Sequence, residues 1–102
     1  MSNSLITTNA MLTNHTGLHA RPSIKLTKIA KASSANVEIS LSPDGPWVNA
    51  KSPVKVMGFR ASVGSSIFFR ASGQGAQEVV TELVALVERN FDEDDVEELN
   101  HA

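Results

Sequence analysis

The residues of this 102-residue chain best suited to chemistry are a histidine and an arginine two positions apart, His19 and Arg21, in the stretch GLHARP at 17–22. A neutral imidazole nitrogen is a nucleophile that can take up a phosphoryl group. The guanidinium group of Arg21 offers a planar set of hydrogen-bond donors that suits phosphate oxygens. The two side chains together indicate phosphate chemistry, provided that the backbone around them can hold an anion.

The predicted secondary structure supplies such a backbone, because a helix is expected at residues 20–31 with His19 just before it. The start of a helix leaves N–H groups unpaired and carries a partial positive charge, a combination that binds phosphate. Pro22 fits the first helical turn, and Gly17 lets the incoming backbone bend freely. The predicted phosphate-binding loop and helix start consist of Thr16, Gly17, Ala20 and Arg21.

Two other interpretations of these histidines stay open from the residues alone. His19 could simply cap the helix, with Arg21 in solvent. His15 and His19 have the four-residue spacing of metal ligands on a helix, but Gly17 disfavours a helix there and no cysteine or nearby carboxylate completes a ligand set. We therefore expect neither a metal site nor a cofactor.

The elements that must position this site follow from hydrophobic periodicity. Strands are predicted at 4–12, 36–41, 47–50 and 65–72, and helices at 20–31, 52–59 and 76–91. The apolar side of the first helix is expected to carry Pro22, Leu26, Ile29, Ala30 and Ser33, and that of the last helix Ala76, Val79, Val80, Leu83, Val84, Leu86 and Val87. Each strand has one apolar face, which favours an antiparallel sheet with one open face. The predicted fold is an α+β, two-layer, open-faced β-sandwich of order β-α-β-β-α-β-α, with its three helices covering one side of a four-stranded antiparallel sheet.

Charge is unevenly distributed along the chain. Six of the eleven acidic residues lie within 92–98, whereas residues 1–91 contain nine basic and five acidic residues, a net charge of +4. The acidic end is expected to be a disordered tail. The chain has no cysteine, no apolar run of 18 residues and no signal-peptide pattern at its start. These features predict a cytoplasmic protein that does not insert into a membrane.

A helical wheel places a basic strip on the first helix, opposite Leu26 and Ala30. Ile24 lies within this strip, where an apolar residue has no core to fill, and Lys55 and Met57 of the short helix could extend the surface. An apolar centre with a charged rim predicts docking of an acidic, partly apolar partner protein. Nucleic acid is a weaker alternative, because aromatic residues are few. The strip consists of Arg21, Lys25, Lys28 and Lys31, and the rings that could stack on bases are Trp47 and Phe68.

The stretch GLHARP resembles the active-site signature of the HPr family, the histidine-containing phosphocarriers of the phosphoenolpyruvate:sugar phosphotransferase system. The resemblance runs from about residue 5 to residue 91. The stretch AKSPVKVMGF at 50–59 is similar to the second signature of the family, which surrounds a regulatory serine. The resemblance implies an HPr-like phosphocarrier domain at 1–91, followed by the acidic tail at 92–102.

The roles that the resemblance implies fall on three residues. His19 matches the histidine that is phosphorylated on Nδ1, Arg21 the arginine that handles the phosphate, and Ser52 the serine that HPr kinase/phosphorylase modifies in many members. The chain would be a stoichiometric phosphotransfer protein and a monomer, with enzyme I as donor and EIIA domains as acceptors. A regulatory phosphocarrier of the nitrogen-related type is the alternative, in which the phosphorylation state controls a partner protein.

The partner-binding surface that this resemblance implies joins the strip on the first helix to the short helix. This chain departs from the family at Pro53, where an apolar aliphatic residue is usual, and plain capping of the short helix by Ser52 is the alternative to its phosphorylation. The predicted partner-binding residues are Ile24, Lys25, Lys28, Lys31, Pro53, Val54, Lys55 and Met57.

Overall fold

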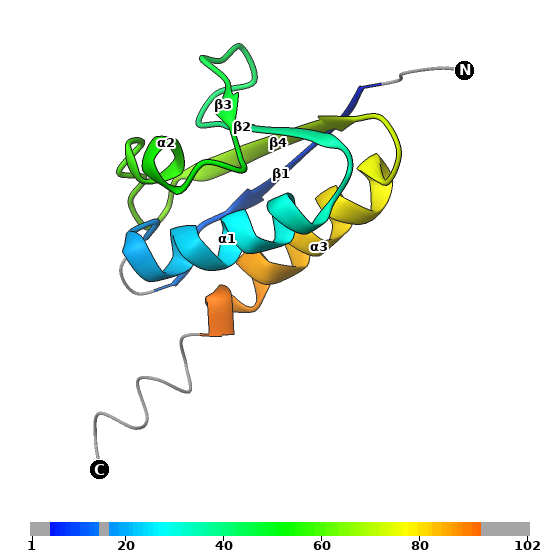
Figure 1. Ribbon diagram of the computed structural model, residues 1–102. Coiled ribbons are helices and arrows are strands. Elements are labelled where there is room, and N and C mark those ends of the chain that lie inside the picture. The colour runs from blue at the N-terminus through cyan, green and yellow to red at the C-terminus, as the bar shows by residue number, and fades with distance from the viewer. Residues whose placement is uncertain (1–4, 15–16, 93–102) are drawn as a thin grey trace.

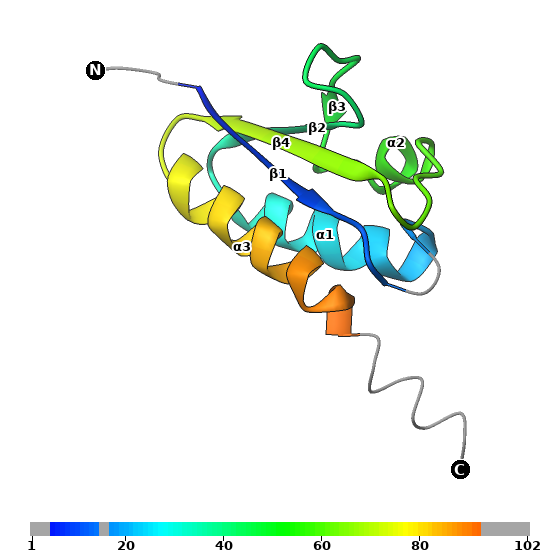
Figure 2. The ribbon, with the colours of Figure 1, turned by 180° about the vertical axis from the view of Figure 1, so that it is seen from behind.

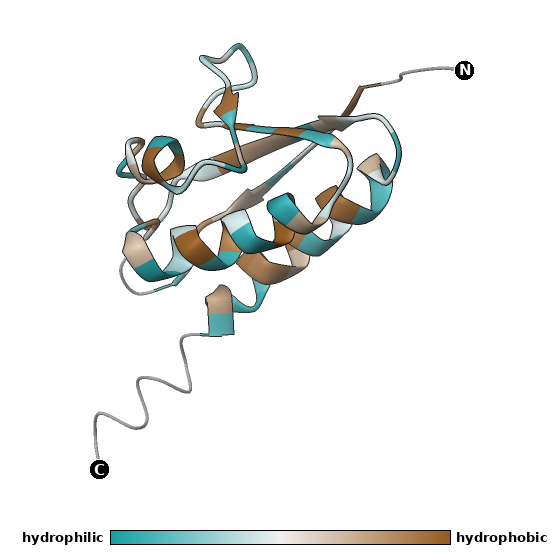
Figure 3. Ribbon diagram, in the orientation of Figure 1, coloured by the Kyte–Doolittle hydropathy of each residue, from teal (hydrophilic) through white to brown (hydrophobic). Residues whose placement is uncertain are grey.

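The computed structural model describes residues 5–14 and 17–92, and its elements follow the predicted order. Polar and apolar residues alternate around α1 and α3, as packing of one side of each helix on a sheet requires (Figure 3). The elements are β1 (Ile6–Met11), α1 (Ala20–Ala32), β2 (Asn36–Ser40), β3 (Val48–Asn49), α2 (Pro53–Met57), β4 (Ser66–Ser72), α3 (Ala76–Glu88) and the short 3₁₀ turn η1 (Asn90–Asp92).

The four strands form one antiparallel sheet in the order β1-β4-β2-β3. In register, Ala71 of β4 pairs with Ile6 on one side and with Val37 on the other, so that these side chains share the face that packs against helices. Figures 1 and 2 show α1 and α3 side by side against that face, while α2 lies near the first turns of α1. The predicted open-faced sandwich is confirmed.

The core lies between the sheet and the two long helices. Its members have at most 8% of their surface exposed, and the periodicity predicted most of them. Two polar residues of α1, Ser23 and Thr27, are also buried, which the apolar pattern did not predict. The largest fully buried apolar side chains are Phe69, Phe91, Leu12, Leu18, Leu26, Ile39, Ile67, Leu83, Val56, Val80 and Val87.

Most elements differ from their predicted bounds by one or more residues at an end, and two of these differences have a clear structural cause. The third strand comprises only Val48 and Asn49, followed by one more hydrogen bond to β2, from the N–H of Ala50 to the carbonyl of Val37 at 2.9 Å. The carbonyl of Asn49 accepts a hydrogen bond from the N–H of Ser52 at 3.2 Å, and the chain turns toward α2. Helix α3 ends at Glu88 rather than at 91. The backbone then takes positive φ angles, and the resulting turn places the Phe91 side chain in the core with 0% exposure. The predicted tail beyond Asp92 lies outside the described residues.

Among residues 5–14 and 17–92, no helix is long and apolar enough to cross a membrane.

A candidate phosphohistidine site at the start of α1

The backbone before His19 is held by contacts with the segment that follows α2. Gly17 has φ +75°, a left-handed conformation that favours glycine, and a Cβ atom there would lie 2.4 Å from the carbonyl oxygen of Ala61. The same oxygen accepts a hydrogen bond from the N–H of Leu18 at 2.9 Å. The buried side chain of Asn14 donates from Nδ2 to the carbonyl of Gly17 at 2.8 Å. The predicted bend at Gly17 is confirmed, and it fixes the place at which α1 begins.

His19 is the N-cap residue of α1, with φ −106° and ψ −158°. Its carbonyl accepts the first helical hydrogen bond, from the N–H of Ser23 at 2.9 Å, while its imidazole makes no capping hydrogen bond to the helix. The side chain is exposed. By helix geometry, the N–H groups of Ala20 and Arg21 have no acceptor inside α1. An exposed imidazole therefore stands at the positive end of a helix, where an anion is stabilised.

A hollow of about 350 Å³ adjoins His19, and it is lined by a second arginine, Arg60, which the motif around His19 does not indicate. Arg60 follows α2 with φ +52°, a left-handed conformation that is uncommon for an arginine, and its N–H donates to the carbonyl of Met57 at 3.0 Å. Arg21 is exposed on the first turn of α1 and does not line this hollow. The lining residues are Leu18, His19, Ala20, Met57, Arg60 and Ala61.

The structure thus brings together His19, Ala20 and Met57 of the predicted site residues, and it adds Arg60. Thr16, a predicted member of the phosphate-binding loop, and His15, of the metal alternative, lie outside the described residues. Within the part of the chain that the structure describes, no three histidine, cysteine or acidic side chains group as metal ligands.

Ser52 is the N-cap residue of α2, as the sequence predicted. Its hydroxyl oxygen accepts a hydrogen bond from the N–H of Lys55 at 3.3 Å, and Pro53 fills the first helical position, where no N–H is needed. Ser52 is half-buried and does not line the hollow at His19. Its modification stays a prediction, and its capping role is a structural finding.

The exposed side chains of α1 and α2 form a mixed apolar and basic surface beside His19. Ile24 is 49% exposed and Val54 75% exposed. Lys28, Lys31 and Lys55 are exposed as well. We refer to the exposed members of α1 and α2 together as the docking surface, which consists of Arg21, Ile24, Lys28, Lys31, Val54 and Lys55.

Lys25 belongs to the predicted strip, but its ammonium group is engaged in a hydrogen bond within the fold. Its Nζ donates to the carbonyl oxygen of Phe91 at 2.6 Å, and its side chain is half-buried. This contact joins α1 to the turn that follows α3. Lys25 is therefore not counted in the docking surface.

The open face of the sheet carries the rings that the nucleic-acid alternative would need. The guanidinium group of Arg70 lies over the Trp47 ring, 4.2 Å from its centroid, and Arg70 Nε also pairs with Glu38 Oε1 at 2.6 Å. One face of the indole is therefore already covered. Phe68 is half-buried. This arrangement does not present a row of free rings for stacked bases.

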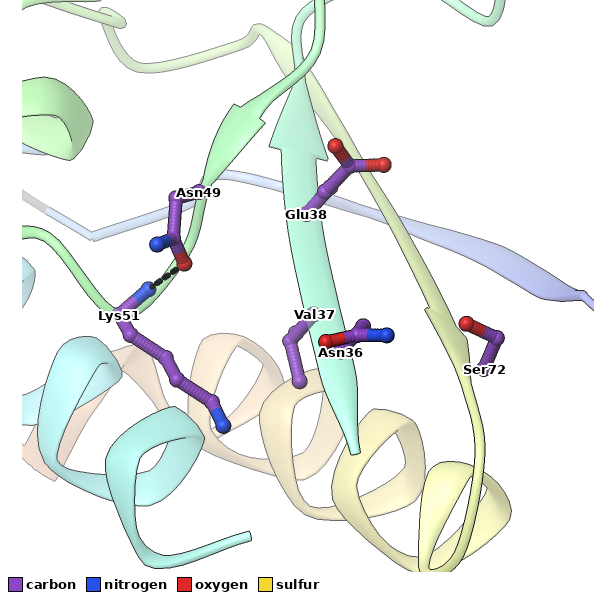
Figure 4. Close-up of a pocket in the computed structure, with 6 residues that line it drawn as sticks. All are labelled: Asn36, Val37, Glu38, Asn49, Lys51 and Ser72. Carbon is purple, nitrogen blue, oxygen red and sulfur yellow. Dashed lines mark hydrogen bonds between the residues drawn. The ribbon is translucent and has the colours of Figure 1, made fainter. Parts of the chain in front are cut away.

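A second hollow, of about 410 Å³, lies at the edge of the sheet between β2, β3 and the end of β4 (Figure 4). Its one lysine, Lys51, donates from Nζ to the carbonyl of Ser33 at 2.9 Å and from its N–H to Asn49 Oδ1 at 2.9 Å. Figure 4 shows the Glu38 side chain pointing away from Lys51. The hydrogen bonds of Lys51 in this hollow hold the backbone of neighbouring segments, and no imidazole lines it.

Comparisons with known proteins show which family and which solved structures this chain is similar to. The family described as "PTS HPr component phosphorylation site" matches residues 6–89. The phosphocarrier protein HPr of Cupriavidus necator is 38% identical over 80 residues, which cover 78% of this chain and 88% of that protein. The phosphocarrier protein NPr of Escherichia coli K12 is 30% identical over 83 residues, covering 81% and 91%. The crystal structure of HPr-C-His from Thermoanaerobacter tengcongensis superimposes with a TM-score of 0.78 at 31% identity, covering 85% of this chain and 96% of that one.

Proposed function

Because the chain belongs to the HPr family of phosphocarrier proteins, we propose that it carries a phosphoryl group on His19, accepted from enzyme I and passed to an EIIA domain. The single observation that supports this most is the exposed imidazole of His19 at the N-terminus of α1. That position joins a nucleophile to a backbone that stabilises anions. The protein acts in stoichiometric amounts in the cytoplasm, as a monomer.

The transfer step is an exchange between two imidazoles. A lone pair on Nδ1 of His19 attacks the phosphorus atom of the donor's phosphohistidine. The new N–P bond forms as the donor's N–P bond breaks, and the donor's imidazole keeps the electron pair of the broken bond. Transfer to an EIIA histidine repeats the step in the forward direction, with the His19 imidazole as leaving group.

The chain supplies the surroundings in which the phosphoryl group is stabilised. The N–H groups of Ala20 and Arg21 and the partial positive charge of α1 offset the phosphoryl charge. Arg60, from the segment after α2, lines the hollow beside His19, and Arg21 lies exposed on the first turn of α1, so the two arginines come from different parts of the chain. Bidentate hydrogen bonds from either arginine suit phosphate oxygens.

The docking surface determines which proteins reach His19. Its exposed apolar side chains, Ile24 and Val54, lie among the cations Lys28, Lys31 and Lys55. A partner with an acidic rim around an apolar patch fits this chemistry, and the charges accelerate the encounter. Enzyme I and EIIA domains are the partners that we assign to it.

Phosphorylation of the protein by enzyme I, called charging below, tests this proposal. Incubation with phosphoenolpyruvate and enzyme I should add one acid-labile phosphate per chain, and His19→Ala should abolish it. The sequence contains three histidines, so His101→Ala is the matched control and should be charged like the unmodified protein. Retention of the acid-labile phosphate in His19→Ala would overturn the assignment of the nucleophile.

A regulatory role of the nitrogen-related type is the second candidate, favoured by the relatives that carry the name NPr. In that case the phosphorylation state of His19 controls a partner protein rather than sugar uptake. Capture experiments with phosphorylated and unphosphorylated protein distinguish the two roles. Recovery of sugar-specific EIIA domains supports transport, and recovery of other regulators in a phosphorylation-dependent way supports regulation.

A further inference from the structure

The end of α3 is tied to the basic side of α1. After Glu88, three residues with positive φ, Asn90, Phe91 and Asp92, turn the chain so that the carbonyl of Phe91 accepts a hydrogen bond from Lys25 Nζ at 2.6 Å. Because the Phe91 ring is fully buried, this turn is held by the core as well. Asp92, the last described residue, therefore directly follows a carbonyl group that Lys25 of α1 binds.

The side of α1 that carries Lys25 is basic and free of acidic residues. Arg21 lies four residues before Lys25 and Lys28 three residues after it, which places all three on one side of the helix, and Lys31 continues the row. Arg21, Lys28 and Lys31 are exposed, as is Ile24 between them. The row is therefore open to a ligand, apart from Lys25.

The segment that follows has the chemistry that this row favours. Residues 93–98 contain five acidic residues and one valine, Val96, and Leu99 comes next. The nearest acid inside the described chain, Asp92, is already paired with Arg89 at 3.1 Å. The segment thus has the same character, acidic and partly apolar, as the partner that the docking surface fits.

The reach of the segment is sufficient. Ten residues, 93–102, follow the described chain, and they can span up to roughly 33 Å when extended. The rise along α1 from Lys25 back to His19 is only about 9 Å. A short tether of this kind gives an effective concentration on the order of millimolar, so even a weak contact would be populated.

We propose that the acidic segment at 93–98 binds the basic side of α1 in the same molecule, over Arg21, Ile24 and Lys28. The segment thereby occupies part of the docking surface and competes with the acidic partner. This regulatory consequence rests on the proposed function, whereas the intramolecular contact does not. Salt weakens the contact because the charges on both sides are exposed.

A spin label tests the contact directly in the full chain. The sequence has no cysteine, so Asn100→Cys provides a single attachment site. At low ionic strength the label should broaden the amide NMR signals of Ile24 and Lys28 and leave that of Asn49, on β3, sharp. High salt, or replacement of the five acids of 93–98 by Gln and Asn, should remove the broadening at α1.

Two results would overturn the proposal. The first is an absence of broadening at α1, or equal broadening at Ile24 and Asn49. The second is broadening that appears only in a mixture of two proteins, one with the spin label but no ¹⁵N and one with ¹⁵N but no spin label. The segment would then bind a second copy of the chain.

The functional consequence is measured separately. Charging by enzyme I at low ionic strength should be roughly two- to fivefold faster in the variant without the five acids. Glu78→Gln, Glu82→Gln and Glu88→Gln together form the matched control, because these acids are exposed on α3 and should not change the rate in the same way. If His19 proves not to be charged at all, the NMR result still decides the contact.

Discussion

Gly17 lies against the carbonyl oxygen of Ala61 so closely that a Cβ atom at Gly17 would stand 2.4 Å from it. Next to this contact, the N–H of Leu18 donates to the same oxygen at 2.9 Å. Because His19 and the start of α1 follow at once, the relationship sets the position of the imidazole relative to Arg60, which precedes Ala61. A glycine is required there for two reasons, its positive φ and the absence of space.

Gly17→Ala is therefore expected to lower the free energy of unfolding by at least about 2 kcal/mol, since it adds a steric clash to the strain of a left-handed residue. It should also slow charging of His19, because the loop must move to relieve the clash. Urea denaturation and an enzyme I charging assay measure the two effects.

Gly64 offers the matched control for this substitution. It has φ +93°, but a Cβ atom there meets nothing within 4 Å. Gly64→Ala should therefore cost only the backbone strain, about 1 kcal/mol, and leave charging unchanged. Equal losses of stability in the two variants would show that the contact with Ala61 contributes nothing.

Arg60 is expected to stabilise the phosphoryl group on His19. Arg60→Gln should slow charging by about tenfold or more, because one charged donor to the phosphoryl oxygens is lost. Arg60→Gly should slow it as much while leaving stability equal or higher by up to about 1 kcal/mol, since glycine adopts the φ of +52° without strain. Arg60→Lys keeps the charge and should recover part of the rate. A normal rate in Arg60→Gln would exclude this role.

Ser52 is expected to matter for stability through its cap on α2. Ser52→Ala removes the acceptor for the Lys55 N–H and should cost about 1 kcal/mol in urea denaturation. Ser52→Asp keeps an oxygen at the N-cap and should be as stable as the unmodified protein. If Ser52→Ala and Ser52→Asp unfold at the same urea concentration, the cap has no measurable energy.

Modification of Ser52 is a separate question, decided with HPr kinase/phosphorylase and ATP. We expect acid-stable phosphate that is absent in Ser52→Ala, because the hydroxyl stands at the start of α2, where a phosphate is stabilised by the helix end. The His19→Ala variant is the control and should still be modified. Failure of the kinase to label the protein would leave Ser52 with its capping role alone, consistent with Pro53 having changed the recognition sequence.

Lys25 and Lys28 should differ although both are basic residues of α1. Lys25→Met removes a charged hydrogen bond to the Phe91 carbonyl and should lower stability by about 1–2 kcal/mol. Lys28→Met should change stability by less than about 0.5 kcal/mol, since its side chain is exposed. It should instead raise the KM for enzyme I at low salt. The opposite result would contradict these roles: a loss of stability in Lys28→Met, together with a Lys25→Met variant that changes only the KM for enzyme I.

Much of the fold was predictable because local and tertiary preferences agree. Alternation at Val37 and Ile39 and helical spacing around Leu26 and Ala30 predicted buried faces. The alternation failed at Leu41, which follows the end of β2 and is exposed. The end of α3 was not predictable, because Phe91 continues a helical pattern, while its burial in the core requires a left-handed turn. Such a turn is settled by tertiary packing rather than by local propensity.

Only those residues of the site that lie close together in the sequence were predictable. The spacing of Gly17, His19 and Arg21 indicated an anion site at a helix start, and the structure places His19 there. Arg60 could not be found in this way, because a non-glycine residue at positive φ has no sequence signal and its nearness to His19 depends on the contact between Gly17 and Ala61. The role of Lys25 depends on a carbonyl 66 residues away, which periodicity cannot reveal.

Discharge of the charged protein tests the central claim most directly. Protein charged by enzyme I and phosphoenolpyruvate is separated from the donor and mixed with a sugar-specific or a nitrogen-related EIIA domain, and the intact masses of both proteins are followed. A phosphocarrier should lose one phosphoryl group as one of these EIIA domains gains one, and the His19→Ala protein should do neither. A phosphoryl group that stays on the chain with both domains, or that is found on a residue other than His19, would contradict the account.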